Sequence, residues 1–285
     1  MQRSLLAIDL DGTLLDPSGR PHDRDVLAVR AALTAGVSVS IVTGRLYSGT
    51  RAAAAVLGLR GPVGCADGSH VVQSGDHVTL VHAGVGAPET SHLRAALSRA
   101  GLTTFVFAND AIGHDPRGAA FVPYVRTWST DIRAAADVYE HDLWDADDGV
   151  TAVVALGPRE RVLQAADDLA RDLTRPVFIV QFPLRREPHV GIWALMARAS
   201  GCTKGTAVRW IAEREGIALK DVVSVGDWIN DLPMFEVAGR SFAMGQAPDE
   251  VKSRATDVLT ETCESGGGVA AAVAKAFGIA PGRLL

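Results

Sequence analysis

The chain alternates short, almost wholly apolar segments with segments of helical pattern, and this alternation limits the folds open to it. The apolar run Leu5–Asp9 precedes a helical pattern over Asp23–Ala35, and the β-branched run Val37–Thr43 precedes an Ala-rich helix over Ser48–Leu57. Strands that are apolar on both faces and are separated by helices are typical of parallel βαβ units. The sequence therefore predicts an α/β fold, a Rossmann-like parallel sheet flanked by helices.

The same alternation returns toward the C-terminus. The further core elements that the pattern predicts are Pro62–Ala66, Val71–Gln73, Val78–His82, Lys204–Glu215, Val222–Val225, Leu232–Val237, Ser241–Met244, Glu250–Arg254, Thr256–Leu259 and a final helix after Gly268. We therefore expect residues 1–84 and 189–285 to form one α/β catalytic core.

Between residues 85 and 188 the rhythm changes, which indicates an inserted module. Its predicted elements are helix Glu89–Ala100, strands Thr103–Phe107 and Ala111–His114, strand Val150–Leu156, helix Arg159–Leu173 and strand Val177–Gln181. Two β-β-α-like units of this kind predict a compact α+β cap. Both crossings fall in segments that contain Gly or Pro, which suit hinges.

Composition excludes several classes of partner. Lys plus Arg number 28 against 33 Asp plus Glu, a formal charge of -5, which leaves no basic footprint for nucleic acid. No apolar stretch approaches the ~20 residues of a membrane helix, and acidic residues interrupt the N-terminal apolar run, unlike a signal peptide. The three cysteines, Cys65, Cys202 and Cys263, show no metal-type spacing or disulfide framework. We expect a cytoplasmic protein with no nucleic-acid or membrane partner and an oligomeric state that the sequence leaves undefined.

Two carboxylates, Asp9 and Asp11, follow the first predicted strand. Residues i and i+2 of an extended segment point the same way, and Gly12 allows a sharp turn beside them. Paired carboxylates repel unless a cation or a shared proton offsets their charge, so the pair indicates chemistry with a metal. Taken alone, an Asp-x-Asp sequence is more often a solvated acidic turn.

Two further motifs suggest anion binding. Thr43 and Gly44, followed by Arg45, end a strand and so supply a hydroxyl and a bare N–H where open α/β sheets bind ligands. Lys204 begins a predicted helix, a position that the helix dipole disfavours for a cation unless it faces an anion such as phosphate. Singly, an ordinary helix start and a solvated lysine are the alternative interpretations.

A third group of polar residues, Asp227, Asn230 and Asp231, lies in one turn after the strand Val222–Val225. Capping of the next helix explains one of them but hardly all three. With Asp9 and Asp11 they make a hard, oxygen-rich site suited to Mg²⁺.

The four motifs occur in the order Asp-x-Asp-Gly-Thr, Thr-Gly, Lys-Gly and Gly-Asp-x-x-Asn-Asp, each at or beside an apolar strand. In this order the chain resembles the haloacid dehalogenase-like (HAD) superfamily and, within it, the class IIB Cof-type sugar-phosphate phosphatases. The resemblance covers essentially the whole chain, including the insertion. It implies a Mg²⁺-dependent phosphatase that hydrolyses a small phosphorylated metabolite, such as a sugar phosphate, through an aspartyl-phosphate.

The resemblance also implies a role for each matching residue. Asp9 would be the nucleophile, and Asp11 would protonate the leaving oxygen and later deprotonate the hydrolytic water. Thr43 and Lys204 would bind the transferring oxygens. The other implied roles are metal ligation by Asp9, Asp11 (through its backbone carbonyl), Asp227 and Asp231, and substrate binding by Gly44, Arg45 and Asn230.

One position departs from the resemblance, and the cap adds open candidates. Related proteins often have Asn-Gly where this chain has Asp67 and Gly68, so the role of Asp67 stays open. In the cap, the candidates to meet a second anionic or hydroxyl-rich end of a substrate are Arg126, Arg185, Arg186 and His189, with solvated side chains as the alternative.

Two other functions remain open at this point. One is phosphohexomutase-type transfer, as in phosphomannomutase, which shares the opening motif. The other is a non-catalytic metabolite-binding protein, which should have lost at least one of the residues Asp9, Asp11, Lys204 and Asp227; all four are present.

Overall fold

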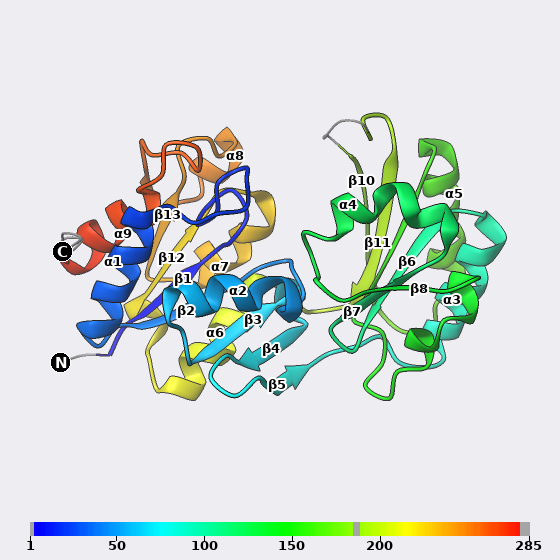
Figure 1. Ribbon diagram of the computed structural model, residues 1–285, viewed down its shortest axis with the longest axis horizontal. Helices are drawn as coiled ribbons and strands as arrows, with labels where there is room; N and C mark the ends of the chain where they lie inside the picture. The colour runs from blue at the N-terminus through cyan, green and yellow to red at the C-terminus, as the bar shows by residue number, and fades with distance from the viewer. Residues whose placement is uncertain (1–2, 185–188, 280–285) are drawn as a thin grey trace. The chain divides into compact units, whose positions relative to one another are not determined.

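The computed structural model describes residues 3–184 and 189–279 and divides the chain into two compact units (Figure 1). The first unit comprises Met1–Gly44, Thr50–Val81 and Cys202–Leu285. The second comprises Arg45–Gly49 and His82–Gly201. Each unit has its own sheet and its own hydrophobic core.

The first unit is built on a parallel five-stranded sheet in the order β14-β13-β12-β1-β2. Its strands are β1 (Leu5–Ile8), β2 (Ser38–Ile41), β12 (Val222–Gly226), β13 (Arg240–Ala243) and β14 (Asp257–Val258). Central strand β1 is buried throughout, since every one of its residues is apolar and both faces are covered. Parallel pairing aligns Ile8 with Ile41 on one side and with Val225 on the other, so the carboxyl ends of these strands lie together.

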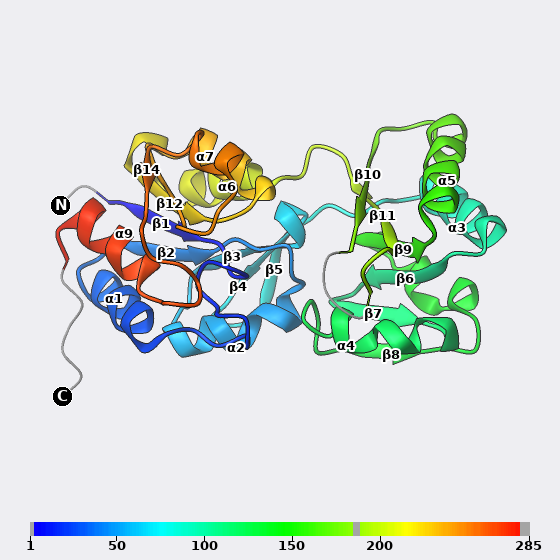
Figure 2. The ribbon, with the colours of Figure 1, turned by 90° about the horizontal axis from the view of Figure 1, so that it is seen from above.

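Helices cover both faces of this sheet (Figure 2). On one face lie α1 (Asp23–Thr34) and α9 (Gly268–Phe277), and on the other lie α6 (Lys204–Glu215) and α7 (Leu232–Val237). The core on the α6 side joins Val208 and Ile211 to Phe235 of α7 and Leu5 of the sheet. The remaining elements of this part of the chain are α2 (Tyr47–Leu57), β3 (Pro62–Cys65), η1 (Ala66–Gly68), β4 (His70–Gln73), β5 (Val78–His82), η5 (Leu219–Asp221), η6 (Ile229–Asp231) and α8 (Asp249–Lys252).

The second unit is an α+β module on a six-stranded sheet in the order β10-β11-β9-β6-β7-β8, antiparallel except between β7 and β8. Its strands are β6 (Thr103–Ala108), β7 (Ala111–His114), β8 (Ile132–Ala134), β9 (Ala152–Gly157), β10 (Val177–Pro183) and β11 (Trp193–Ala199). Helices α3 (Glu89–Ala100) and α5 (Arg159–Asp172) pack on one face, where Leu97 and Leu169 join Val106 and Val153 in a single core.

A short helical segment packs on the other face of this sheet. It contains η2 (Pro116–Phe121) and α4 (Val122–Val125), and the Trp128 ring lies 6.0 Å from that of Phe107. Tyr124 packs edge-on against Trp128 at 5.1 Å, and Phe121 lies 4.5 Å from the His189 ring. These half-buried aromatic side chains therefore pack on one another and on the sheet.

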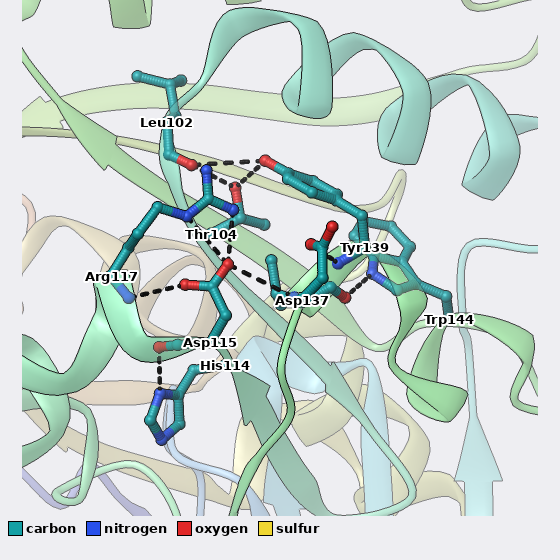
Figure 3. Close-up of polar contacts among 9 residues, drawn as sticks. Leu102, Thr104, His114, Asp115, Arg117, Asp137, Tyr139 and Trp144 are labelled. Atoms are coloured by element: carbon teal, nitrogen blue, oxygen red, sulfur yellow. Dashed lines mark hydrogen bonds and ion pairs between the residues drawn. The ribbon is translucent and has the colours of Figure 1, made fainter.

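A polar network around the buried carboxylate of Asp115 ties the start of η2 to a later loop, because the backbone N–H of Val138 donates to Asp115 at 3.4 Å (Figure 3). Asp115 accepts hydrogen bonds from Nε and Nη2 of Arg117 at 3.0 and 2.5 Å, and from the Arg117 backbone at 2.9 Å. In η3 (Val138–Glu140), the Tyr139 hydroxyl lies 2.8 Å from that of Thr104. Near it, in η4 (Asp142–Asp145), Trp144 donates to the carbonyl of Val138 at 2.8 Å.

The predicted fold class, a parallel α/β core flanked by helices with an additional α+β module, is confirmed. Two strands of the second unit, β8 and β11, were not predicted, and β11 falls in residues that the sequence analysis assigned to the core. The compact units divide at Val81 and Gly201, whereas the sequence placed the boundaries at residues 84 and 188. Within residues 3–184 and 189–279, no helix has the length and apolarity needed to cross a membrane.

Candidate active site

Three carboxylates gather at the carboxyl edge of the parallel sheet. Asp9 follows β1, and Asp227 and Asp231 lie in the turn after β12. One carboxylate oxygen from each of them lies within 4.8 Å of the others. The backbone N–H of Asp9 donates to the carbonyl of Val225 at 2.9 Å, so the parallel pairing of β1 with β12 brings the two acidic segments together.

Lys204 supplies a positive charge within this group. Its ammonium nitrogen lies 2.5 Å from Oδ1 of Asp9 and 2.6 Å from Oδ1 of Asp231, and its side chain is 2% exposed. Burial by itself lowers the pKa of Lys204, but the charges of Asp231 and Asp9 outweigh it and raise that pKa above its usual value. Lys204 is therefore a buried, permanently charged cation at the first residue of α6.

Asp231 holds the turn that carries Asp227. Its Oδ2 accepts from the backbone N–H groups of Asp227 at 2.8 Å and of Trp228 at 3.0 Å, while its Oδ1 accepts from Lys204. Both oxygens of this fully buried carboxylate are thus engaged within the protein. Asp231 therefore positions Lys204 and the turn. Its carboxylate also belongs to the group of three that could hold a metal ion, so its predicted role as a metal ligand stays a prediction.

The carboxylate of Asp227 is fixed by groups from two other loops. Thr13 donates to its Oδ1 at 3.4 Å, and the Gln246 side chain lies 3.4 Å from its Oδ2. Gln246 also donates to the carbonyl of Gly12 at 2.5 Å and accepts from the backbone N–H of Cys263 at 3.1 Å. Gln246 therefore links the Asp227 carboxylate to the loop that contains Asp11.

The charges of the site fit a hard divalent cation. Burial and the neighbouring Asp231 raise the pKa of Asp9 well above its usual value, and the same two causes raise the pKa of Asp227 to about 6. Such shifts show that one ammonium leaves the negative charge of three clustered carboxylates incompletely balanced. An all-oxygen carboxylate donor set suits Mg²⁺, so the residues present fit that ion.

Asp11 occupies a different position from the other acidic residues. It is exposed, and among the described residues its side chain is outside the group of three clustered carboxylates. This is consistent with the expectation that Asp11 offers a metal only its backbone carbonyl. Its carboxylate is exposed to solvent, as a group that exchanges protons with water must be.

A second loop cluster, on the same unit, surrounds Thr43 and Gly44. Thr43 is buried and follows β2; its backbone N–H donates to Gly64 of β3, and its carbonyl accepts from the N–H of Asp67 at 3.0 Å. Oδ1 of Asp67 in turn accepts from the Asn230 amide at 3.0 Å. The structure therefore links the Thr-Gly motif, through Asp67, to the turn that also carries Asp227.

The remaining candidates belong to the second unit or lie outside the described residues. Arg45 belongs to the second unit, where its guanidinium donates to the carbonyl of Gly49 at 3.2 Å. In that unit Arg126 is exposed and His189 packs on Phe121. Two further cap candidates, Arg185 and Arg186, lie outside the described residues.

Gln246 was not among the site residues that the sequence predicted. It lies just after the predicted strand Ser241–Met244, in the sequence Gly245-Gln246-Ala247. A polar side chain after a core strand was the available signal, because such positions meet at the ligand-binding edge of an α/β sheet. The fold and the site together define an α/β enzyme core with a carboxylate–lysine centre at that edge.

Comparison with known proteins identifies the family. The family model described as haloacid dehalogenase-like hydrolase matches residues 6–273. The chain is 26% identical to the pyridoxal phosphate phosphatase YbhA of Escherichia coli (strain K12), covering 91% of this chain and 94% of that protein. It is 28% identical to the 5-amino-6-(5-phospho-D-ribitylamino)uracil phosphatase YwtE of Bacillus subtilis (strain 168), covering 92% and 94%.

The fold of a solved structure agrees. The HAD subclass IIB sugar phosphatase BT4131 matches with a TM-score of 0.75 at 21% identity, covering 97% of this chain and 99% of that chain. The chain belongs to the haloacid dehalogenase-like hydrolase family and is an enzyme of that class. The resemblance to the haloacid dehalogenase-like family, inferred from the order of four motifs, is confirmed.

Proposed function

We propose that this protein is a Mg²⁺-dependent phosphatase that hydrolyses the phosphate monoester of a small metabolite, such as a sugar phosphate, through an aspartyl-phosphate. The observation that carries the proposal is the Asp9 carboxylate, which lies 2.5 Å from the Lys204 ammonium and belongs to a carboxylate group with Asp227. A nucleophilic carboxylate must be ionised. Burial and Asp231 oppose ionisation of Asp9, whereas the Lys204 ammonium favours it, and a bound Mg²⁺ would add further positive charge in its favour.

Mg²⁺ would be held by Asp9, Asp227 and the backbone carbonyl of Asp11. When bound, it supplies positive charge that screens the carboxylates from an anionic phosphoryl group. Lys204 would bind a transferring oxygen together with Thr43 and the N–H of Gly44, where negative charge is spread in the transition state. Asp231 would hold Lys204 and the Asp227 turn in place.

In the first step, an oxygen of Asp9 attacks phosphorus and the bond between phosphorus and the ester oxygen breaks. Asp11 gives its proton to that leaving oxygen, so the alcohol departs neutral. In the second step, Asp11 takes a proton from water as the water oxygen attacks phosphorus. The bond between phosphorus and Asp9 then breaks, which releases inorganic phosphate and restores the free carboxylate.

The substrate class is supported by the relatives. The names of YbhA and YwtE both describe phosphate monoesters of small molecules, but with unrelated alcohol parts. Since the proposed nucleophile, proton donor and phosphate-binding residues act only on the phosphoryl group and its ester oxygen, the rest of the alcohol must be selected by other residues. The proposal therefore extends to the class of small phosphorylated metabolites and to no individual one.

The Asp9→Asn variant tests the mechanism. Phosphate release from a panel of sugar phosphates, nucleotides and phosphorylated cofactors is measured with Mg²⁺ and with a chelator. We expect release only with Mg²⁺, and a loss of at least roughly 10³-fold in the variant because the amide cannot form the covalent intermediate. Asp23→Asn, the same change at an exposed position on α1, is the control and should keep full activity.

Two outcomes would contradict the proposal. Unchanged turnover in Asp9→Asn would exclude the aspartyl-phosphate. Isomerisation of a hexose phosphate, stimulated by a sugar bisphosphate and with little phosphate release, would instead identify a phosphohexomutase.

A further inference from the structure

Asp67 is held in an unusual backbone conformation between the proposed phosphate-binding loop and the Asp227 turn. Its φ is 51°, that of the preceding Ala66 is 49°, and that of the following Gly68 is 93°. Residues with a side chain rarely adopt positive φ, and two in succession persist only when their surroundings fix them. Such strain is often found at functional sites.

The surroundings of Asp67 do fix this loop. A Cβ on Gly68 would lie 2.2 Å from the carbonyl oxygen of Thr203, so the loop packs directly against the start of α6, where Lys204 lies. The N–H of Asp67 donates to the carbonyl of Thr43 at 3.0 Å. Asp67 is thus anchored to both of the segments that carry the proposed phosphate ligands.

The Asp67 carboxylate is directed toward the same segments. A Cβ built on Gly44 would lie 3.4 Å from its Oδ1, and the charge of Asp67 contributes to the raised pKa of Lys204. Its Oδ1 accepts from the Asn230 amide at 3.0 Å, and among the described residues Asn230 is the only side chain that donates to this carboxylate. Asp67 is half-buried, so part of the residue is exposed to solvent.

A carboxylate in this position cannot itself bind the transferring phosphoryl group, because both are anions. It can only accept hydrogen bonds, and its charge attracts cations and repels other anions. We propose that Asp67 determines specificity: it selects phosphate esters whose alcohol part carries a hydroxyl or ammonium donor near the ester, and rejects esters with a second anionic group there. This inference rests on the proposed phosphatase function and narrows its substrate class.

A matched series of two-carbon esters tests the inference. Phosphoethanolamine, 2-hydroxyethyl phosphate and 2-phosphoglycolate carry an ammonium, a hydroxyl and a carboxylate at the same distance from the phosphate. The wild-type protein should prefer the first two over phosphoglycolate by roughly tenfold or more in kcat/KM, because like charges that meet in a binding site are strongly disfavoured. Raising the salt concentration should reduce this preference.

Asp67→Asn removes the charge and little else. Asn tolerates positive φ as well as Asp does, and the introduced amide oxygen can still accept from Asn230. In this variant the preference for phosphoethanolamine and 2-hydroxyethyl phosphate over phosphoglycolate should fall by about tenfold, so that the kcat/KM values become nearly equal. Glu213→Gln, which removes one negative charge from an exposed position on α6, should leave the preference unchanged.

4-Nitrophenyl phosphate carries neither an added donor nor an added charge. Its hydrolysis therefore tests the phosphatase activity separately from the role of Asp67 in specificity. Where a two-carbon ester turns over too slowly to measure, its inhibition constant against 4-nitrophenyl phosphate hydrolysis replaces kcat/KM. If 4-nitrophenyl phosphate is hydrolysed but the wild type shows no charge preference, or Asp67→Asn retains it, the role of Asp67 is refuted and the phosphatase stands. If no ester is hydrolysed with Mg²⁺ present, the phosphatase proposal fails and the inference fails with it.

Discussion

Gly12 is the residue on which the geometry of the loop after β1, which contains Asp11, depends most directly. Its φ is +81°, and a Cβ at this position would lie 2.4 Å from Oδ2 of Asp227. Its carbonyl accepts the 2.5 Å hydrogen bond from Gln246. The absence of a side chain therefore allows the loop after β1 to approach the Asp227 carboxylate.

The variants Gly12→Ala and Gly19→Ala separate this close approach from backbone strain. Gly19 has the same φ of +81°, but a Cβ there would meet nothing within 4 Å. Urea unfolding should show that each variant loses on the order of 1 kcal/mol, because both impose positive φ on alanine. Only Gly12→Ala should also lose phosphate release, by roughly tenfold or more, because it displaces Asp227. Equal activity in the two variants would show that the contact with Asp227 does not matter.

For single residues, the sequence predicts which side chains of the site lie close together, but it does not predict all of their hydrogen bonds. Asp9, Lys204 and Asp227 could be placed together because each lies at the end of a predicted strand or the start of a predicted helix. The hydrogen bonds of Asp231 to two backbone N–H groups depend on the detailed path of a turn, which the pattern of apolar residues does not specify. Gln246 escaped notice because its approach to Gly12 depends on the strand order of the sheet.

At the element scale, the core was more predictable than the second unit. Helices α6 and α7 begin and end where the sequence predicts, since their apolar residues recur with helical period. Strand β11 was missed because Trp193–Ala199 is rich in Ala, Leu, Met and Arg, which favour helices; its pairing with β9 and β10 overrides that preference. Strand β8 has three residues, too few for any period to show.

The carboxylate of Asp115 links η2 to η3, and its contribution to the free energy of unfolding should depend on pH. Burial alone raises the pKa of Asp115, but hydrogen bonds from Arg117 and from the N–H of Val138 outweigh it and hold that pKa below its usual value. A lowered pKa contributes stability above the unfolded value, which is lost as the pH falls through the folded value. At about pH 7, Asp115→Asn should therefore cost about 1–3 kcal/mol, and the difference from wild type should shrink below about pH 4.

Urea unfolding followed by tryptophan fluorescence at several pH values measures this difference. The control is Asp131→Asn, since Asp131 pairs with Arg133 at 2.7 Å but both side chains are 44% exposed. That change should cost less than about 1 kcal/mol, as exposed ion pairs contribute little. A cost for Asp115→Asn that is small or independent of pH would contradict the assignment of a charged, stabilising carboxylate.

At the scale of the whole molecule, the second unit has the properties of a separate folding domain. It contains one hydrophobic core drawn from both of its long helices and its sheet. The short segment Arg45–Gly49 also belongs to it: Leu46 donates to the carbonyl of Trp128, and Ser48 donates to Oδ1 of Asp110, both at 2.9 Å. Residues 82–201 by themselves therefore lack the contacts that Arg45–Gly49 makes within the unit.

We predict that residues 82–201, expressed alone, fold into a cooperative unit. Circular dichroism and tryptophan fluorescence should show a structured protein that is less stable, by about 1–3 kcal/mol, than the same unit in the whole chain, because the hydrogen bonds of Ser48 and Leu46 are lost. Adding a peptide of residues 44–50 should raise its unfolding midpoint. A fragment without cooperative unfolding would show that the unit depends on the rest of the chain.

The Lys204 ammonium places a permanent positive charge of the chain's own among its clustered acids. Small metal-dependent domains such as zinc fingers fold only when their ion is present, so ion supply controls how much folded protein exists. Here the cation is part of the polypeptide and is available as soon as α6 packs. If the enzyme depends on Mg²⁺ as proposed, a cell short of magnesium would keep it folded but idle, and restoring the ion would return activity without new synthesis.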